Sequence, residues 1–219
     1  KNTQRSNESK AELKNSVFFD FFGDIHTNSK NWPIKKLSTV TLKIQDGTHF
    51  SPDLLEHGVP YVTSKHISGG SFEFNSQPMY ISEKAHAGIY GRCDVKINDV
   101  LLVKDGARTG VAVVNPVDWE FSLLSSVAMI RCDPDVMTFE FLCSQINQQS
   151  YGQYLRSRMG GAAIKRLTLK KINDLEIMVP PLTLQKKFSR IIKRINNFHS
   201  SAKQRTNEIA LGLQQEMLT

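Results

Sequence analysis

Long apolar runs and closely spaced cysteines are missing from this 219-residue sequence, and acidic side chains are scarce in one long basic segment. No stretch approaches the ~20 consecutive apolar residues of a membrane-spanning helix, which argues against a membrane partner. No apolar segment of the signal-peptide kind follows Lys1, and the chain does not begin with methionine. We therefore expect a cytoplasmic protein that is represented here by a fragment.

Metal-binding and catalytic motifs are also lacking. Cys93, Cys132 and Cys143 have no short spacings and the histidines are scattered, so we expect free thiols and no bound metal. No phosphate loop of the Walker type and no nucleophile elbow occurs. The string Asn115-Pro116-Val117-Asp118 lacks the second proline and the aromatic residue of an adenine methyltransferase turn. The sequence therefore predicts no catalytic residue and no cofactor bound by this chain.

Acidic residues are scarce between residues 153 and 205, where thirteen Lys and Arg side chains accompany only Asp174 and Glu176. This segment has a net charge of +11, and because the whole chain is +7, the remainder is about −4. A basic segment joined to a mildly acidic body favours a polyanionic partner, most simply nucleic acid. A solvated helix face that keeps the protein soluble would explain the same charge.

What the sequence does have is a heptad pattern that begins after Val179-Pro180-Pro181. It predicts a coiled-coil-type helix over residues 181–219 that spans roughly 57 Å if residues 182–219 are all helical. An ordinary amphipathic core helix is the alternative. The side chains expected to pack are Leu184, Phe188, Ile191, Ile195, Phe198 and Ile209.

The rest of the chain indicates an α+β fold. A first helix is expected from Ala11 to Phe22, ended by Gly23, and its phenylalanines must dock on the long helix or on the next domain. Short strands, a hairpin with a polar tip at 104–110, a short helix at 33–37 and a helix at 139–158 follow. Because they show no βαβ rhythm, we expect a mixed, β-rich body before the long helix.

Candidate nucleic-acid contacts come from charge and loop position. Arginine suits guanine O6 and N7 in the major groove, which favours Arg108 at the hairpin tip. Each residue taken singly is equally explained as an exposed loop side chain, and His49 as a structural histidine. The candidates are Thr48, His49, Lys65, His66, Lys104, Arg108, Thr109, Arg156, Arg158, Lys165 and Arg166.

A set of strings, in order along the chain, resembles the specificity subunits of type I restriction–modification systems. The match covers about residues 13–200. The strings that carry the resemblance are Trp32-Pro33-Ile34-Lys35-Lys36-Leu37, Asp46-Gly47-Thr48-His49, Gly58-Val59-Pro60-Tyr61-Val62, Lys65-His66-Ile67, Asn98-Asp99-Val100-Leu101-Leu102 with Gly106 and Gly110, and Leu175-Glu176-Ile177 running into Val179-Pro180-Pro181-Leu182 and Gln185.

The resemblance implies a domain plan. Residues 1–24 correspond to the end of a preceding spacer helix, 25–180 to a target-recognition domain and 181–219 to a long spacer helix. Family members carry two recognition domains, whereas this sequence holds one. We therefore expect the C-terminal half of a longer subunit, or a half-size subunit that pairs with another copy through its spacer helix.

The resemblance also implies a function without catalysis by this chain. Such a subunit binds double-stranded DNA, with each recognition domain reading half of a split sequence. Methyltransferase subunits then transfer methyl from S-adenosylmethionine to adenine, and restriction subunits cut DNA with ATP and Mg. Two alternatives stay open: the recognition end of a single-chain restriction enzyme–methyltransferase, and a coiled-coil scaffold for protein partners.

Overall fold

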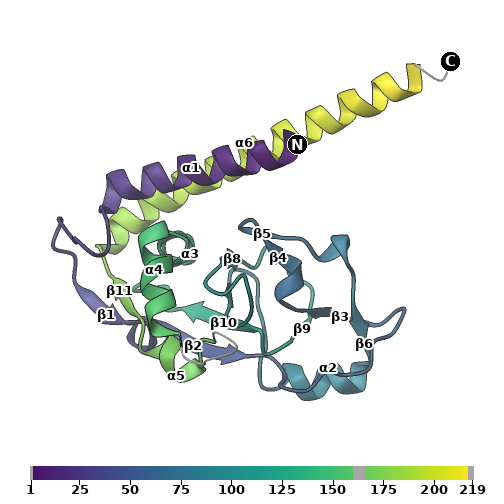
Figure 1. The fold of residues 1–219 in the computed structure, drawn as a ribbon, viewed down its shortest axis with the longest axis horizontal. Helices are drawn as coiled ribbons and strands as arrows, with labels where there is room; N and C mark the ends of the chain where they lie inside the picture. The colour runs from purple at the N-terminus through teal and green to yellow at the C-terminus, as the bar shows by residue number, and fades with distance from the viewer. Residues whose placement is uncertain (1, 160–165, 217–219) are drawn as a thin grey trace.

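The structure, a computed structural model, describes residues 2–159 and 166–216, with side-chain surroundings for residues 9–159, 166–201, 204 and 205. A pair of long helices lies along one side of a mixed α+β body (Figure 1). The pair consists of α1 (Asn2–Phe22) and α6 (Leu182–Glu216), which contact each other and run antiparallel. The predicted long C-terminal helix is therefore confirmed, and α1 begins earlier than the sequence indicated.

A four-stranded antiparallel sheet of order β2-β10-β7-β8 forms the centre of the body. Leu102 and Ile130 face the helices on one side of this sheet, while Leu101 and Met129 face smaller sheets on the other. Because both of their faces are buried, β7 and the first four residues of β10 read as continuous apolar runs. The expected hairpin at 104–110 is confirmed as β7–β8. The strands are β2 (Thr41–Asp46), β7 (Val100–Val103), β8 (Ala112–Val114) and β10 (Val127–Cys132).

Short elements cover the two faces of this sheet and confirm the α+β class. Helices α3 (Phe139–Ile146), α4 (Gln149–Arg158) and α5 (Leu169–Asn173) contribute to the core on one face. The other face packs against a sheet of order β6-β3-β9, the hairpin β4–β5 and residues near helix α2. These elements are β3 (Val59–Val62), β4 (Ile67–Ser68), β5 (Ser71–Phe72), β6 (Tyr80–Ile81), α2 (Glu83–Tyr90) and β9 (Ser122–Leu123), with 3-10 turns η1 (Leu37–Thr39), η2 (Ser64–His66) and η3 (Phe74–Ser76).

Four phenylalanines join the helical pair to the body. Phe18 and Phe22 of α1 pack against Phe141 of α3 and Phe188 of α6, and all four side chains are buried. The ring of Phe22 lies 4.7 Å from that of Phe141 and 5.2 Å from that of Phe188, both edge-on. Edge-to-face contacts of this kind add to the free energy of apolar burial. The expected docking of the N-terminal phenylalanines is therefore confirmed, on both the long helix and the body.

The packed face of α6 follows the predicted heptad stripe only at its start. Phe188 is buried and Leu184, Ile191 and Ile195 are half-buried. Phe198, in contrast, is 79% exposed, so the packing predicted for it is not made within this chain.

A row of buried side chains, Gln185, Ser189 and Ile192, lies next to Leu184, Phe188 and Ile191 of the predicted stripe. The buried face of α6 is therefore wider than the stripe in this part of the helix. The Gln185 amide also fixes the row, because its Oε1 accepts from the backbone N–H of Thr138 at 2.9 Å. The side chain of Ile209 lies outside the described residues.

The short helix expected at 33–37 is wrong. Residues Ile34–Lys36 form β1, which pairs antiparallel with β11 (Glu176–Met178). The chain turns into η1 only afterwards. The strand depends on a partner some 140 residues away, and local propensity carries no information about such a partner.

The single helix expected at 139–158 is two helices, α3 and α4. The break falls at Asn147 and Gln148, where Gln148 adopts an extended conformation. Asn147 leaves the helix because its side chain pairs with the backbone of Ala112 in β8, accepting at 3.0 Å and donating at 2.8 Å. The side-chain amide of Asn147 therefore pairs with β8 as a neighbouring strand would, and the same residue ends helix α3.

We predict that Phe22→Ala lowers the free energy of unfolding by about 3–5 kcal/mol, because a fully buried ring is removed at the joint between helices and body. Phe19→Ala is the matched control, since Phe19 lies in the same helix and is 59% exposed. Its expected change is within about 0.5 kcal/mol. Urea unfolding followed by circular dichroism measures both, and equal losses would contradict the role of the joint.

Candidate nucleic-acid interface

Several loops meet where β2 and β7 end and β10 begins. The Thr48 N–H donates to the carbonyl of Leu123 at 2.8 Å, and the Lys104 N–H donates to that of Ser126 at 2.9 Å. The Ser64 N–H donates to the Ser126 hydroxyl at 3.2 Å, which brings the end of β3 to the same place. Segments that are far apart in the sequence therefore share one end of the central sheet.

A buried ion pair lies under these loops. The Lys104 ammonium is 3.3 Å from Asp46 Oδ2 and 3.6 Å from Asp105 Oδ2. Lys104 and Asp46 are 3% and 2% exposed. The candidate DNA contact at Lys104 is therefore corrected: its charge is already paired and enclosed, so it holds the strand ends together.

Asp46 also lies close to two exposed side chains, His49 and Arg92. His49 Nε2 lies 3.4 Å from Asp46 Oδ2, and Arg92 Nη1 lies 3.8 Å from Asp46 Oδ1. Arg92 Nη2 donates to the Gly47 carbonyl. Arg92 is absent from the candidates predicted from the sequence, because it follows α2 and belongs to no cluster of basic residues. Its place beside β2 depends on the fold.

Arg108 ties the hairpin tip to the neighbouring loop. Its Nη1 lies 3.4 Å from the carbonyls of Ser64 and Lys65 and 3.3 Å from that of Ile67. The residue remains exposed, as does Lys65. The guanidinium is thus oriented through Nη1, while the N–H groups of its other nitrogens stay available to a ligand.

Arg166 joins the same cluster through an exposed ion pair. Its Nε donates to Asp105 Oδ1 at 2.9 Å, and Leu167 N–H donates to the Lys104 carbonyl at 3.0 Å. The segment after α4 is therefore brought to the hairpin tip. Lys165, also a candidate, lies outside the described residues.

Three further candidates serve the fold. His66 is fully buried: its Nδ1 accepts from the Thr63 N–H at 2.9 Å and its Nε2 lies 2.8 Å from the Gln77 carbonyl. Thr48 is buried, and its hydroxyl donates to the Phe50 carbonyl at 3.1 Å. The Thr109 hydroxyl donates to the Gly106 carbonyl at 2.6 Å, which closes the hairpin turn. His66 and Thr48 are thus corrected as ligand contacts, because both are enclosed.

Two candidates lie apart from the strand ends, on the last turn of α4. Arg158 is 3.9 Å from Glu176 of β11 and stacks over the ring of Tyr154 at 5.1 Å. Arg156 is exposed beside it. The residues that do gather at the strand ends are exposed basic side chains, named here the basic edge: His49, Lys65, Arg92, Arg108 and Arg166.

The basic edge is suited to binding an anion.

Burial raises the pKa of Cys93, Cys132 and Cys143 to about 12, so these thiols are protonated at neutral pH. Among the described residues, no group of three or more His, Cys, Asp or Glu side chains could hold a metal ion. Nor does any helix there have the length and apolar character to cross a membrane.

Comparison with known families assigns the sequence to one of them. Residues 22–211 match the family described as the type I restriction modification DNA specificity domain. The chain belongs to that family. No curated protein matches the sequence.

Solved structures share the fold of this specificity domain at low identity. The HsdS subunit from Thermoanaerobacter tengcongensis is 16% identical with a TM-score of 0.58, and the match covers 92% of this chain and 47% of that one. The S subunit from M. genitalium is 14% identical with a TM-score of 0.62, covering 96% and 53%. A third structure, from a study of complex assembly and conformational transition of the type I R-M system, is 15% identical with a TM-score of 0.57, covering 97% and 53%. The chain thus spans about half the length of these structures.

We predict that Asp46→Asn destabilises the specificity domain by about 3 kcal/mol, because it leaves the Lys104 ammonium buried with a single, more distant carboxylate. Asp174→Asn is the matched control. It removes the same charge from an ion pair with Lys36 that lies in solvent, and we expect no measurable change. Thermal or urea unfolding compares the two. Similar stability of both variants would show that Lys104 does not need Asp46.

Proposed function

We propose that this chain recognises a DNA sequence for a type I restriction–modification complex, and that the basic edge makes the contact. The observation that supports the proposal is the convergence of four exposed Lys and Arg side chains and His49, from five separate segments, at one end of a rigid sheet in a member of the DNA specificity family. Phosphate contacts position a protein on the duplex, and side chains that reach base edges supply specificity.

Two kinds of contact are assigned within the basic edge. Lys65 is exposed on η2 and suits a phosphate, as a flexible point charge. Arg108 is held at the hairpin tip by three carbonyls, so its free donors are pre-oriented for a guanine edge. The Phe50 ring next to His49 is 68% exposed and places an apolar surface beside these cations.

The finer assignments follow the same proposal. The chain reads one half of a split site, and a second recognition domain reads the other half. Methyltransferase subunits use S-adenosylmethionine to methylate adenine, and restriction subunits use ATP and Mg to cut, so catalysis lies outside this chain. The exposed Phe198 and a row of exposed basic residues on α6 suit docking of a second spacer helix or an acidic surface: Lys186, Lys187, Arg190 and Arg194.

We predict that deleting the gene removes one split adenine-methylation motif from the host genome. Sequencing of modified bases with and without the gene measures this. Restoring the gene should restore the motif, and restoring it with Arg108→Ala should not. An unchanged set of methylated motifs after deletion would defeat the proposed function.

We predict different salt responses for two variants of the complete modification complex. Arg108→Ala should weaken binding to the methylated motif by roughly 10-fold while leaving nonspecific binding nearly intact, because a bidentate base contact is worth about 1–3 kcal/mol. Lys65→Ala should weaken all duplexes alike and reduce the slope of log affinity against log salt by about 0.9.

Lys35→Ala is the control for these titrations, because it removes an equally exposed charge on β1, outside the central sheet. It should leave affinity and salt slope unchanged. Fluorescence anisotropy with specific and scrambled duplexes, at several salt concentrations, separates the outcomes. If all three variants behaved alike, the basic edge would not be the binding surface.

A further inference from the structure

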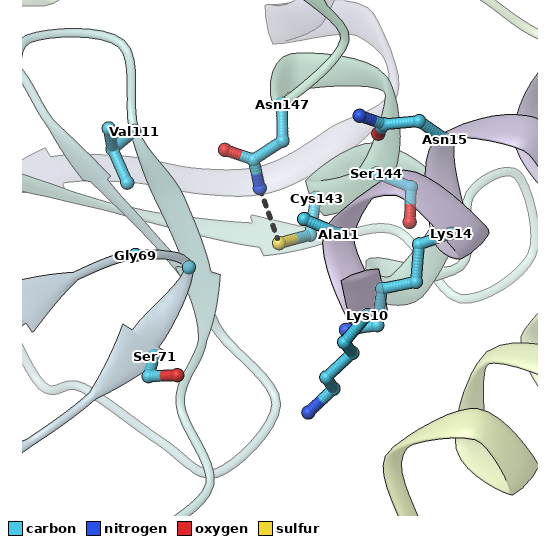
Figure 2. Close-up of a pocket in the computed structure, with 11 residues that line it drawn as sticks. Lys10, Ala11, Lys14, Asn15, Gly69, Ser71, Val111, Cys143, Ser144 and Asn147 are labelled. Carbon is cyan, nitrogen blue, oxygen red and sulfur yellow. Dashed lines mark hydrogen bonds between the residues drawn. The ribbon is translucent and has the colours of Figure 1, made fainter. Parts of the chain in front are cut away.

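A cavity of about 300 Å³ lies between helix α1 and the β4–β5 hairpin. Helix α3 forms its third wall. Figure 2 shows the Lys10 and Lys14 side chains reaching from α1 into the space between α1 and Gly69 and Ser71. Cys143 and Ser144 line the α3 side.

The two lysines place like charges one helical turn apart in a partly enclosed space. Lys14 is half-buried, and burial lowers the pKa of its ammonium. Among the described residues, no carboxylate forms an ion pair with Lys14. Glu140, which lines an adjoining cavity with Lys14, is instead 3.3 Å from Lys193. A cation that has lost part of its hydration without gaining a counter-charge favours binding of an anion.

The wall opposite the lysines leaves room for such an anion. Gly69 and Gly70 form the β4–β5 turn with φ of +56° and +73°, and a Cβ at either would meet no atom within 4 Å. Bare backbone therefore faces the lysines. Ser71 and Ser144 add hydroxyl groups to the lining, and hydroxyls donate readily to phosphate oxygens.

We propose that this cavity binds a phosphate-bearing anion, with Lys10 and Lys14 as its cationic ligands. Two sources share this chemistry. One is a phosphodiester of DNA bound at the basic edge, since the Ile67 carbonyl that anchors Arg108 begins the same hairpin. The other is a free phosphate compound. If the anion is a phosphodiester of DNA, the inference rests on the proposed function. If it is a free phosphate compound, the inference is independent of that function.

Inorganic pyrophosphate titrated into the full chain, followed by calorimetry, tests the site. We expect saturable binding that is weakened at least about 10-fold by Lys10→Met with Lys14→Met, because the charges that replace hydration of the anion are lost. The control pair Lys35→Met with Lys170→Met removes two exposed lysines elsewhere and should leave binding unchanged. Equal binding by the lysine-cavity variant and the wild type would overturn the proposal, as would equal weakening by the control.

Two further measurements keep the test independent of folding and of DNA recognition. Pyrophosphate should raise the Tm of the wild type and of Lys14→Arg, which keeps the charge, but not that of Lys14→Gln. A rise in Lys14→Gln equal to that of the wild type would also count against the site. Pyrophosphate that competes with duplex DNA identifies the phosphodiester as the source, and binding without competition identifies a free phosphate compound. Loss of a methylation motif in the host is a separate readout, so the two proposals can fail separately.

Discussion

The arrangement of the basic edge depends on a buried ion pair between Lys104 and Asp46. Because the central sheet is covered on both faces, its strand ends have little water to solvate a charge, and each member of the pair needs the other. The pair joins the ends of β2 and β7, which are separated in the sheet by β10. Two exposed arginines then attach to this cluster, Arg92 through Asp46 and Arg166 through the neighbouring Asp105. Asp46 and Asp105 thus position basic side chains at the surface, and the buried charges beneath that surface are paired.

The phenylalanine joint places a second constraint on the molecule. Phe22 contacts one ring from the body and one from α6, so the direction of the helical pair follows from the position of α3. Gln185 reinforces this with hydrogen bonds from α6 to the backbone before α3. Rigid packing at this point makes α6 an extension of the body rather than a tethered arm. A recognition domain fixed to a long helix in this way has a defined distance and rotation relative to whatever binds farther along the helix.

Sequence patterns correctly predicted the elements that are determined by residues close together in the sequence. The apolar period indicated α6, and the polar tip between two apolar runs indicated the β7–β8 hairpin. The family was apparent from the order of several weak strings. Charge and loop position were poorer guides to which side chains are accessible, because they do not distinguish Lys104, enclosed by two carboxylates, from Arg108, which is exposed. Arg92 escaped notice because its partner, Gly47, lies 45 residues away. The β1 strand and the break at Asn147 were missed for the same reason, since each is decided by a distant backbone.

The β4–β5 hairpin connects the two positive regions of the molecule. Arg108 donates to the Ile67 carbonyl at the start of the hairpin, and the glycine turn at its tip lines the cavity with Lys10 and Lys14. Since Lys14 belongs to the helix whose phenylalanines form the joint, the cavity lysines and the basic edge are parts of one packed unit. Charges held at fixed separations match the repeating phosphates of a duplex better than charges on mobile loops, because less side-chain and loop entropy is lost on binding. Under the proposed function, the rigid joint and the buried ion pair have the same role: both hold positively charged side chains at fixed positions.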